Sequence, residues 1–168
     1  MPYQSFHELF PERAAEETRS IILEKEERSD GLLPEGKYSF LEMFCNERGC
    51  DCRRVMFYVV SDCDEQRRVK AVIAWGWESR HFYRKWFRSD DPETLAALKG
   101  PTLNVGSPQS KLAPALLDLV REVLLQDPAY VERVESHYWA FRNKIEGRNI
   151  VEMRRHRSPL KRRRSRRV

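Results

Sequence analysis

Three cysteines lie close together in the sequence and carry its most specific chemical signal. Cys45, Cys50 and Cys52 form a C-x4-C-x-C pattern within the segment FCNERGCDCRRV. Thiolates are soft ligands that suit zinc, and one short turn can bring three of them to a single tetrahedral ion. We therefore predict that these three cysteines bind zinc.

The setting of the cysteines favours metal binding over disulfide formation. The N-terminal twenty residues contain neither the apolar stretch of an export signal nor an arginine-rich, acid-poor transit pattern. We expect a cytoplasmic protein, and clustered cysteines in a reducing compartment are more often metal ligands than disulfide partners.

Two histidines are candidates for a fourth zinc ligand. His137 shares a helical stripe with Tyr130, Val134 and Phe141, so it should face the core rather than water. A helix packed over the sheet could bring its imidazole to the three thiolates. We predict His137 as the fourth ligand and keep His81 as the alternative.

His81 is a candidate because of strand topology. It follows a strand-like run that ends near Trp77, and a meander returns that end of the strand to the Cys50–Cys52 turn. Cys63 is expected to lie far from this turn. A strand of seven residues separates it from Cys52, and such a strand spans about 20 Å.

The ligand set indicates the kind of zinc site. Three cysteines and one histidine fill a tetrahedral ion, which favours a structural site and a binding or adaptor-like role over enzymatic activity. One alternative is a metal-dependent hydrolase with an open three-cysteine site, in which Glu42 or Glu78 moves a proton. A second alternative is a metal-free interaction domain that contacts nucleic acid through its basic tail. Four nearby arginines should neutralise the thiolate charge or form an anion pocket: Arg48, Arg53, Arg54 and Arg80.

The elements that must position these residues follow from the hydrophobic pattern. Apolar residues at helical spacing predict an amphipathic helix over residues 11–27. Three runs rich in aromatic and β-branched residues predict strands over residues 37–45, 54–60 and 69–77. The connections between them are too short for crossover helices, so the strands should form an antiparallel meander. Pairing Ser61 with Arg68 sets the expected register of the last two strands.

The second half of the chain is predicted to be helical. Capping residues and prolines indicate four helices, over residues 81–87, from Asp91-Pro92 to Gly100, over 110–126, and from Asp127-Pro128 onward. We therefore expect the α+β class: a small three-stranded antiparallel meander packed with helices, with an N-terminal helix and a helical C-terminal half.

Charge divides the chain into two parts. The 168 residues carry a net charge of +5, yet residues 153–168 alone carry nine Lys and Arg and no acidic residue, which leaves −4 for the rest. We expect a single domain over residues 1–152 and a disordered basic tail over 153–168. The tail could bind nucleic acid phosphates non-specifically, chiefly through Arg162, Arg163, Arg164, Arg166 and Arg167. No apolar run is long enough to span a membrane.

The cysteine segment also resembles a family. An aromatic residue followed by C-x4-C-D-C-R-R-V is similar to a motif of a group of uncharacterised prokaryotic proteins. The similarity continues through FYRKWF, LKGPTL and YVERVESHYWAFR and covers most of residues 32–142. The resemblance implies a site built on the cysteines and no particular activity.

Overall fold

The computed structural model describes residues 3–24 and 33–147 and has an α+β architecture. Six strands form one antiparallel sheet: β1 (Tyr3–Ser5), β2 (Ser20–Leu23), β3 (Gly36–Cys45), β4 (Arg54–Ser61), β5 (Ala71–Gly76) and β6 (Thr102–Leu103). The helices are α1 (Phe6–Leu9), α2 (Pro11–Glu17), α3 (Arg80–Phe87), α4 (Pro92–Lys99), α5 (Ala113–Glu122) and α6 (Pro128–Glu146), with a 3₁₀ turn, η1 (Leu124–Gln126), between the last two. The predicted class is confirmed.

The predicted meander forms the centre of a larger sheet. β3, β4 and β5 are hydrogen-bonded in sequence order, while β1 and β2 both pair with β3 and β6 pairs with β5. Val59 pairs with Ala71, one position away from the predicted register. A slip of one residue between two paired strands would turn the apolar side chains of one strand to the opposite face of the sheet. The register is therefore set by the need to keep these side chains in the core.

The N-terminal segment differs from the prediction. The expected helix over residues 11–27 ends at Glu17, and Ser20–Leu23 pairs with the first half of β3 as β2, whereas residues 25–27 lie outside the described residues. Ile21 and Ile22, which we assigned to a helical face, are β-branched residues that suit a strand. The free edge of β3 gives them backbone partners, so tertiary pairing outweighs the helical spacing.

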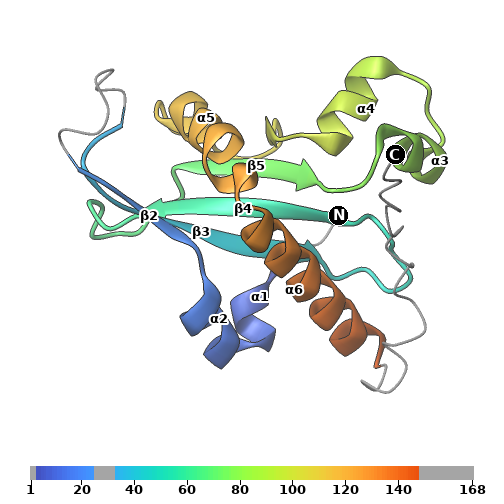
Figure 1. The fold of residues 1–168 in the computed structure, drawn as a ribbon, viewed down its shortest axis with the longest axis horizontal. Helices are drawn as coiled ribbons and strands as arrows, with labels where there is room; N and C mark the ends of the chain where they lie inside the picture. The colour runs from blue at the N-terminus through green and yellow to red at the C-terminus, as the bar shows by residue number, and fades with distance from the viewer. Residues whose placement is uncertain (1–2, 25–32, 148–168) are drawn as a thin grey trace, which may run out of the picture.

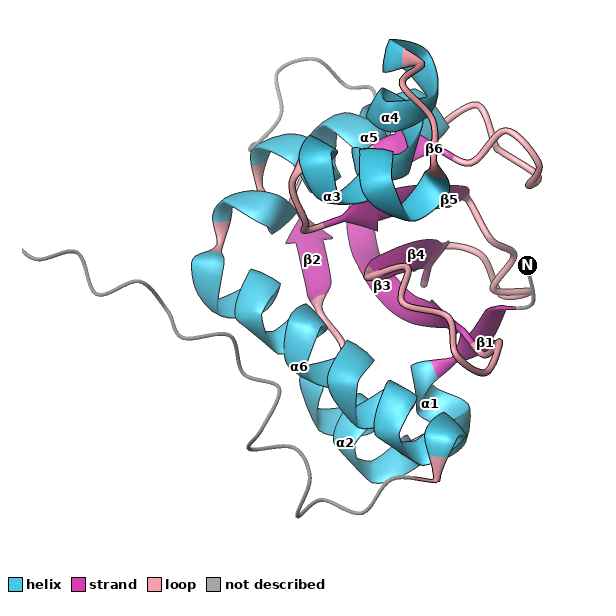
Figure 2. Ribbon diagram, turned by 90° about the vertical axis from the view of Figure 1, so that its right-hand side faces the viewer, coloured by secondary structure: helices cyan, strands magenta, loops and turns pink. Residues whose placement is uncertain are grey.

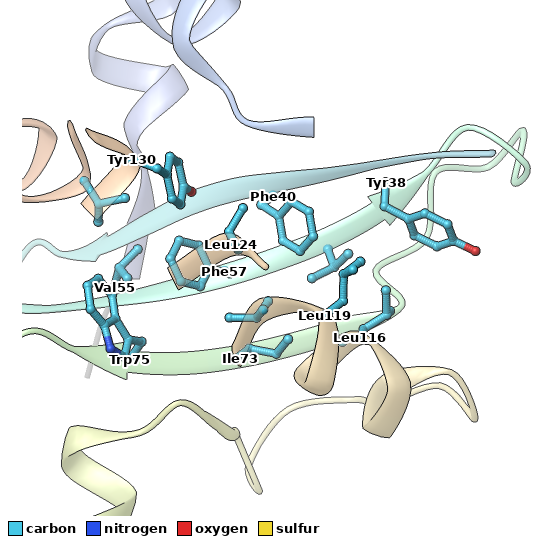
Figure 3. Close-up of a cluster of buried hydrophobic side chains, with 14 of the residues drawn as sticks. Tyr38, Phe40, Val55, Phe57, Ile73, Trp75, Leu116, Leu119, Leu124 and Tyr130 are labelled. Carbon is cyan, nitrogen blue, oxygen red and sulfur yellow. The ribbon is translucent and has the colours of Figure 1, made fainter. Parts of the chain in front are cut away.

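The core lies between the sheet and the two C-terminal helices. Figure 1 shows α5, η1 and α6 crossing one face of the sheet, and Figure 2 shows that face from the side. Alternate residues of the central strands point to these helices, as period-two patterning requires. Figure 3 shows the packed side chains, all of them buried: Tyr38, Phe40, Val55, Phe57, Ile73, Trp75, Leu116, Leu119, Leu124 and Tyr130.

The edge of the sheet at β5 is closed by a side chain. β6 pairs with β5 only at Ile73 and Ala74. Beyond this short strand, the side-chain amide of Gln109 forms the hydrogen bonds that a neighbouring strand would form. Its Oε1 accepts from the Val72 N–H, and its Nε2 donates to the Val72 carbonyl, both at 3.0 Å. The backbone of β5 is therefore satisfied where β6 does not reach it.

Candidate metal centre

The three cysteines predicted as ligands converge at one end of the sheet. Cys45 is the last residue of β3, and Cys50 and Cys52 lie in the loop that leads to β4. Their sulfur atoms all lie within 4.8 Å of one another, and none forms a disulfide. Cys45 and Cys52 are buried, while Cys50 is half-buried. This group of side chains could hold a metal ion.

The loop that carries the cysteines turns sharply at two residues with left-handed backbones. Gly49 has φ +74° and Arg53 has φ +48°. Between them, the Cys50 N–H bonds to the Glu47 carbonyl at 3.3 Å and closes a tight turn. Glycine adopts a positive φ at no steric cost, whereas an arginine in this region is held by its surroundings.

Two tyrosines hold the peptide groups of Arg53. The Tyr138 hydroxyl of α6 accepts from the Arg53 N–H at 3.2 Å, and the Tyr83 hydroxyl of α3 donates to the Arg53 carbonyl at 2.8 Å. A Cβ at position 76 would collide with the Tyr83 hydroxyl, so Gly76 is what lets this tyrosine reach the loop. The strained residue next to Cys52 is thus fixed by two helices.

The Arg53 side chain is itself fixed by a separate set of contacts. Its guanidinium forms ion pairs with Asp51 at 2.9 Å and with Glu78 at 2.7 Å. It also lies over the rings of Phe82 and Trp139, at 4.7 and 5.4 Å from their centroids. The Arg53 charge, which we expected beside the thiolates, is thus paired with two carboxylates.

A third residue, Arg142 of α6, holds the start of the loop. Its Nη1 donates to the carbonyls of Cys45 and Glu47, both at 2.9 Å, and its Nη2 is paired with Glu146. Glu146 in turn accepts from the Gly49 N–H at 2.8 Å. The side chain of Arg142 is buried. Together these contacts bring α6 against the loop and fix the position of Cys45.

The three thiols do not ionise independently. A hydrogen bond from Cys52 lowers the pKa of Cys45 to about 6, helped by the Glu47 N–H and the Arg142 charge and opposed by burial. Burial and the neighbouring Cys45 raise the pKa of Cys50, and the hydrogen bond to Cys45 together with burial raises that of Cys52. One thiolate at Cys45 is thus favoured, and the raised pKa values of Cys50 and Cys52 disfavour further ionisation.

Backbone N–H groups lower the pKa values of the three cysteines in a repeating pattern. The N–H of Glu47 lowers the pKa of Cys45, that of Cys52 lowers the pKa of Cys50, and that of Arg54 lowers the pKa of Cys52. Each donor lies two residues after the sulfur it contacts. N–H donors stabilise negative charge on sulfur, as they do around metal-bound thiolates.

Arg54 is a buried positive charge at the same end of the sheet. Its Nη2 donates to the Ala97 carbonyl at 3.1 Å, whereas its buried Nε has no partner in the described part of the chain. Burial raises the pKa of Tyr3 to about 12; the Arg54 charge opposes this shift and the three thiols add to it. Arg54 and the three thiols therefore shift the pKa of the same side chain, Tyr3, in opposite directions. Arg48 and Arg80, also expected near the thiolates, are exposed.

His137 is not brought to the thiols. It is 1% exposed on α6, so the predicted inward orientation holds, but both ring nitrogens contact carboxylates. Nδ1 lies 2.7 Å from Glu42 Oε2, and Nε2 lies 2.5 Å from Glu17 Oε2. The ring stacks on Phe6 with centroids 4.2 Å apart. The expectation of a His137 ligand is therefore corrected: the helix meets the loop through Tyr138 and Arg142 instead.

The other predicted residues also lie apart from the three sulfurs. His81 is exposed in the first turn of α3 and does not join the cluster. Cys63 is exposed near the opposite end of β4, with its sulfur 2.9 Å from the Glu35 carbonyl. The five tail arginines predicted to contact nucleic acid lie outside the described residues: Arg162, Arg163, Arg164, Arg166 and Arg167.

The carboxylates considered as proton shuttles are engaged elsewhere. Glu42 is buried against His137 and Tyr130, and Glu78 is paired with Arg53. A cavity of about 320 Å³ lies beside Glu42 and His137 rather than at the cysteines. Its lining residues are Ser5, Phe6, His7, Glu8, Ala14, Thr18, Leu41, Glu42 and His137.

Sequence reasoning missed the residues that hold the loop. Tyr83 and Tyr138 each act through one hydrogen bond, and Arg142 through two, to backbone groups more than 25 residues away. Only Arg142 carried a signal, because a charged residue four positions after Tyr138 falls on the buried stripe of α6 and calls for a partner.

No helix in residues 3–24 and 33–147 is both long and apolar enough to cross a membrane. Comparisons of the chain with protein-family models, with curated proteins and with solved structures give no match.

Proposed function

We propose that this chain is a zinc-binding protein in which Cys45, Cys50 and Cys52 hold one ion with a structural role. The observation that carries the proposal is the convergence of three unpaired sulfurs within 4.8 Å. Zn–S bonds of ~2.3 Å at tetrahedral angles separate the sulfurs by about 3.8 Å, so only small side-chain shifts are needed. A multi-iron cluster would hold its cysteines farther apart, which favours a single ion.

The charges around the loop support an anionic metal–thiolate group. Zn²⁺ with three thiolates has a net charge of −1, and burying that charge requires compensation. Arg142 and Arg54 are both buried near the sulfurs, and Arg54 has an unpartnered Nε. The three backbone N–H groups add further stabilisation of the sulfur charge.

The fourth position of the ion is proposed to be taken by water. Within the described ranges, no other histidine, cysteine or carboxylate joins the three sulfurs. An open position is also what a hydrolase needs. Against that role, Glu42 and Glu78 are tied to other residues, and the cavity beside His137 is not lined by any cysteine. A structural role is therefore the better supported one.

The structural role follows from what the loop connects. The cysteine loop joins β3 to β4 and contacts α3 and α6 through Arg53 and Cys45. An ion that fixes the three sulfurs would stabilise the junction of the sheet with both helices, and its binding free energy would add to folding. We further propose a binding or adaptor-like role in a reducing cytoplasm, with the basic tail providing non-specific nucleic-acid contact.

Metal content and stability together test this proposal. Protein purified without chelators should contain one equivalent of zinc, and cobalt substitution should give the sulfur-to-metal absorption of a thiolate site. Cys50→Ser should lose the metal and lower the Tm, whereas Cys63→Ser, at an exposed thiol outside the cluster, should change neither. Wild-type protein without stoichiometric metal would refute the zinc site. Unchanged Tm after metal removal would refute its structural role.

A further inference from the structure

The cysteine group offers three donors rather than four. The sulfur atoms of Cys45, Cys50 and Cys52 lie within 4.8 Å of one another. Neither His137 nor His81 completes the set, because the first is bonded to two carboxylates and the second is exposed on α3. Three sulfur donors suit an element that forms three bonds and needs no fourth ligand.

We infer that the same three thiols bind trivalent arsenic, taken up as arsenous acid. Arsenic(III) forms three bonds to sulfur in a pyramid and carries a lone pair in the fourth direction. The reaction is an exchange without oxidation or reduction: As(OH)₃ and three cysteine thiols give As(S-Cys)₃ and three water molecules. Three As–O bonds break and three As–S bonds form, and each departing hydroxide takes a thiol proton, or a proton from solvent where Cys45 is already ionised.

Burial favours this product. The sulfurs of Cys45 and Cys52 belong to residues with 0% and 1% exposure, where a charged complex would lose its hydration. The arsenic complex is neutral, and the acid that enters is neutral as well. The half-buried Cys50 gives the acid a first thiol to attack, and the two buried thiols then displace the remaining hydroxides. The buried As–S bonds are shielded from water, which slows their hydrolysis.

This inference rests on the same convergence of sulfurs as the proposed zinc site, but the two ions make different demands. Zinc requires a fourth ligand and compensation of a net charge of −1, whereas arsenic requires neither. Arg54→Met should therefore weaken zinc binding and leave arsenite binding within about twofold. Arg54→Lys, which keeps the charge, is the matched control.

Native mass spectrometry of the full chain with sodium arsenite tests the inference directly. One arsenic atom should bind, with a mass gain equal to arsenic less three hydrogen atoms. A gain larger than this by the mass of one water would show a two-thiol adduct that keeps one hydroxide on arsenic, and it would overturn the inference. Bound zinc without any arsenic adduct would also overturn it and leave the zinc proposal standing, whereas an arsenic adduct without zinc binding would do the reverse.

Single cysteine variants identify which thiols bind arsenic. Cys45→Ser, Cys50→Ser and Cys52→Ser should each weaken arsenite binding by at least about 100-fold, the upper end of what losing an outer partner costs a metal site. Cys63→Ser should bind as wild type does. If Cys63→Ser alone abolished the adduct, the assignment would be wrong. Circular dichroism separates loss of binding from loss of folding, and the wild-type mass measurement stands even if a variant fails to fold.

Discussion

Arg142 donates from Nη1 to the carbonyl of Cys45 at 2.9 Å, so a residue of the last helix fixes the first cysteine of the candidate metal centre. The same nitrogen reaches the Glu47 carbonyl at 2.9 Å. The two carbonyls belong to the end of β3 and to the loop after it. One buried guanidinium thereby holds the point where the strand ends and the loop begins.

Arg142→Met should destabilise the protein by about 2–4 kcal/mol. The substitution leaves the Cys45 and Glu47 carbonyls without their buried donor, and an unsatisfied buried group costs about 1–3 kcal/mol. Urea denaturation measures the loss. Arg121→Met is the control, because Arg121 is exposed and only paired with Asp118, and its effect should stay within about 0.5 kcal/mol. Equal effects of the two variants would contradict the proposed role of Arg142.

His137→Leu should destabilise the fold without removing zinc. Glu42 is buried against His137, and leaving a buried polar group without its hydrogen-bond partner costs about 1–3 kcal/mol. Zinc content of the folded variant should remain one equivalent, as measured by elemental analysis. His81→Leu, at an exposed position, should affect neither quantity. A folded His137→Leu protein without zinc would restore His137 as a ligand.

Zinc affinity should rise steeply with pH. Above the Cys45 pKa of about 6 that thiol is already ionised, while the pKa values of Cys50 and Cys52 are raised. Zinc must therefore displace two protons, and affinity should increase about 100-fold per pH unit between that value and the raised pKa values. Competition with a chelator across this range gives the slope. A slope of three protons would mean that Cys45 is not ionised in the free protein.

Arg54→Met should weaken zinc binding by about 10–100-fold, the usual cost of losing an outer partner of a metal site. Because the Arg54 Nε is buried without a partner, the metal-free protein should keep or gain stability when the charge is removed. Chelator competition measures the first effect and urea denaturation of metal-free protein the second. Identical zinc affinity in Arg54→Met and wild type would show that Arg54 does not compensate the thiolate charge.

Acid should remove part of the stability through Glu17. Partial burial raises the pKa of Glu17, but hydrogen bonds from His137 and Arg13 outweigh burial and lower it below the ordinary value. A carboxyl with a lowered folded-state pKa adds stability above its unfolded pKa, which is lost as the pH falls through the folded value. Glu17→Gln should therefore flatten the stability curve in this acidic range, measured by urea denaturation. Glu12→Gln, at an exposed position of the same helix, should keep the wild-type curve.

The sequence was informative where local chemistry decides the structure. Asp91 and Asp127 cap α4 and α6 as predicted, because their carboxylates accept from Thr94 N at 2.7 Å and Ala129 N at 3.0 Å. The cysteine cluster was predictable for the same reason, since a turn within eight residues brings the sulfurs together. Such features depend on neighbours in the chain.

Prediction from the sequence failed where residues far apart in the chain determine the structure. β1 and β6 are too short to show a period, and β2 forms because β3 offers a free edge to Ile21 and its neighbours. The stripe of α6 indicated that His137 faces inward, but not which buried group it meets. That depends on how far the helix is shifted along the sheet. It also depends on the rotation of the helix: Tyr138 follows His137 directly, about 100° further around α6, and it is the hydroxyl of Tyr138 that reaches the loop.

The amide of Gln109 has a consequence for how copies of this protein can meet. By pairing with both backbone groups of Val72, it fills the place that an incoming strand from another molecule would need. Exposed strand edges are the usual starting points for aggregation by strand addition. At this edge one neutral side chain occupies the backbone groups of Val72, which disfavours the addition of a strand from another copy of the chain.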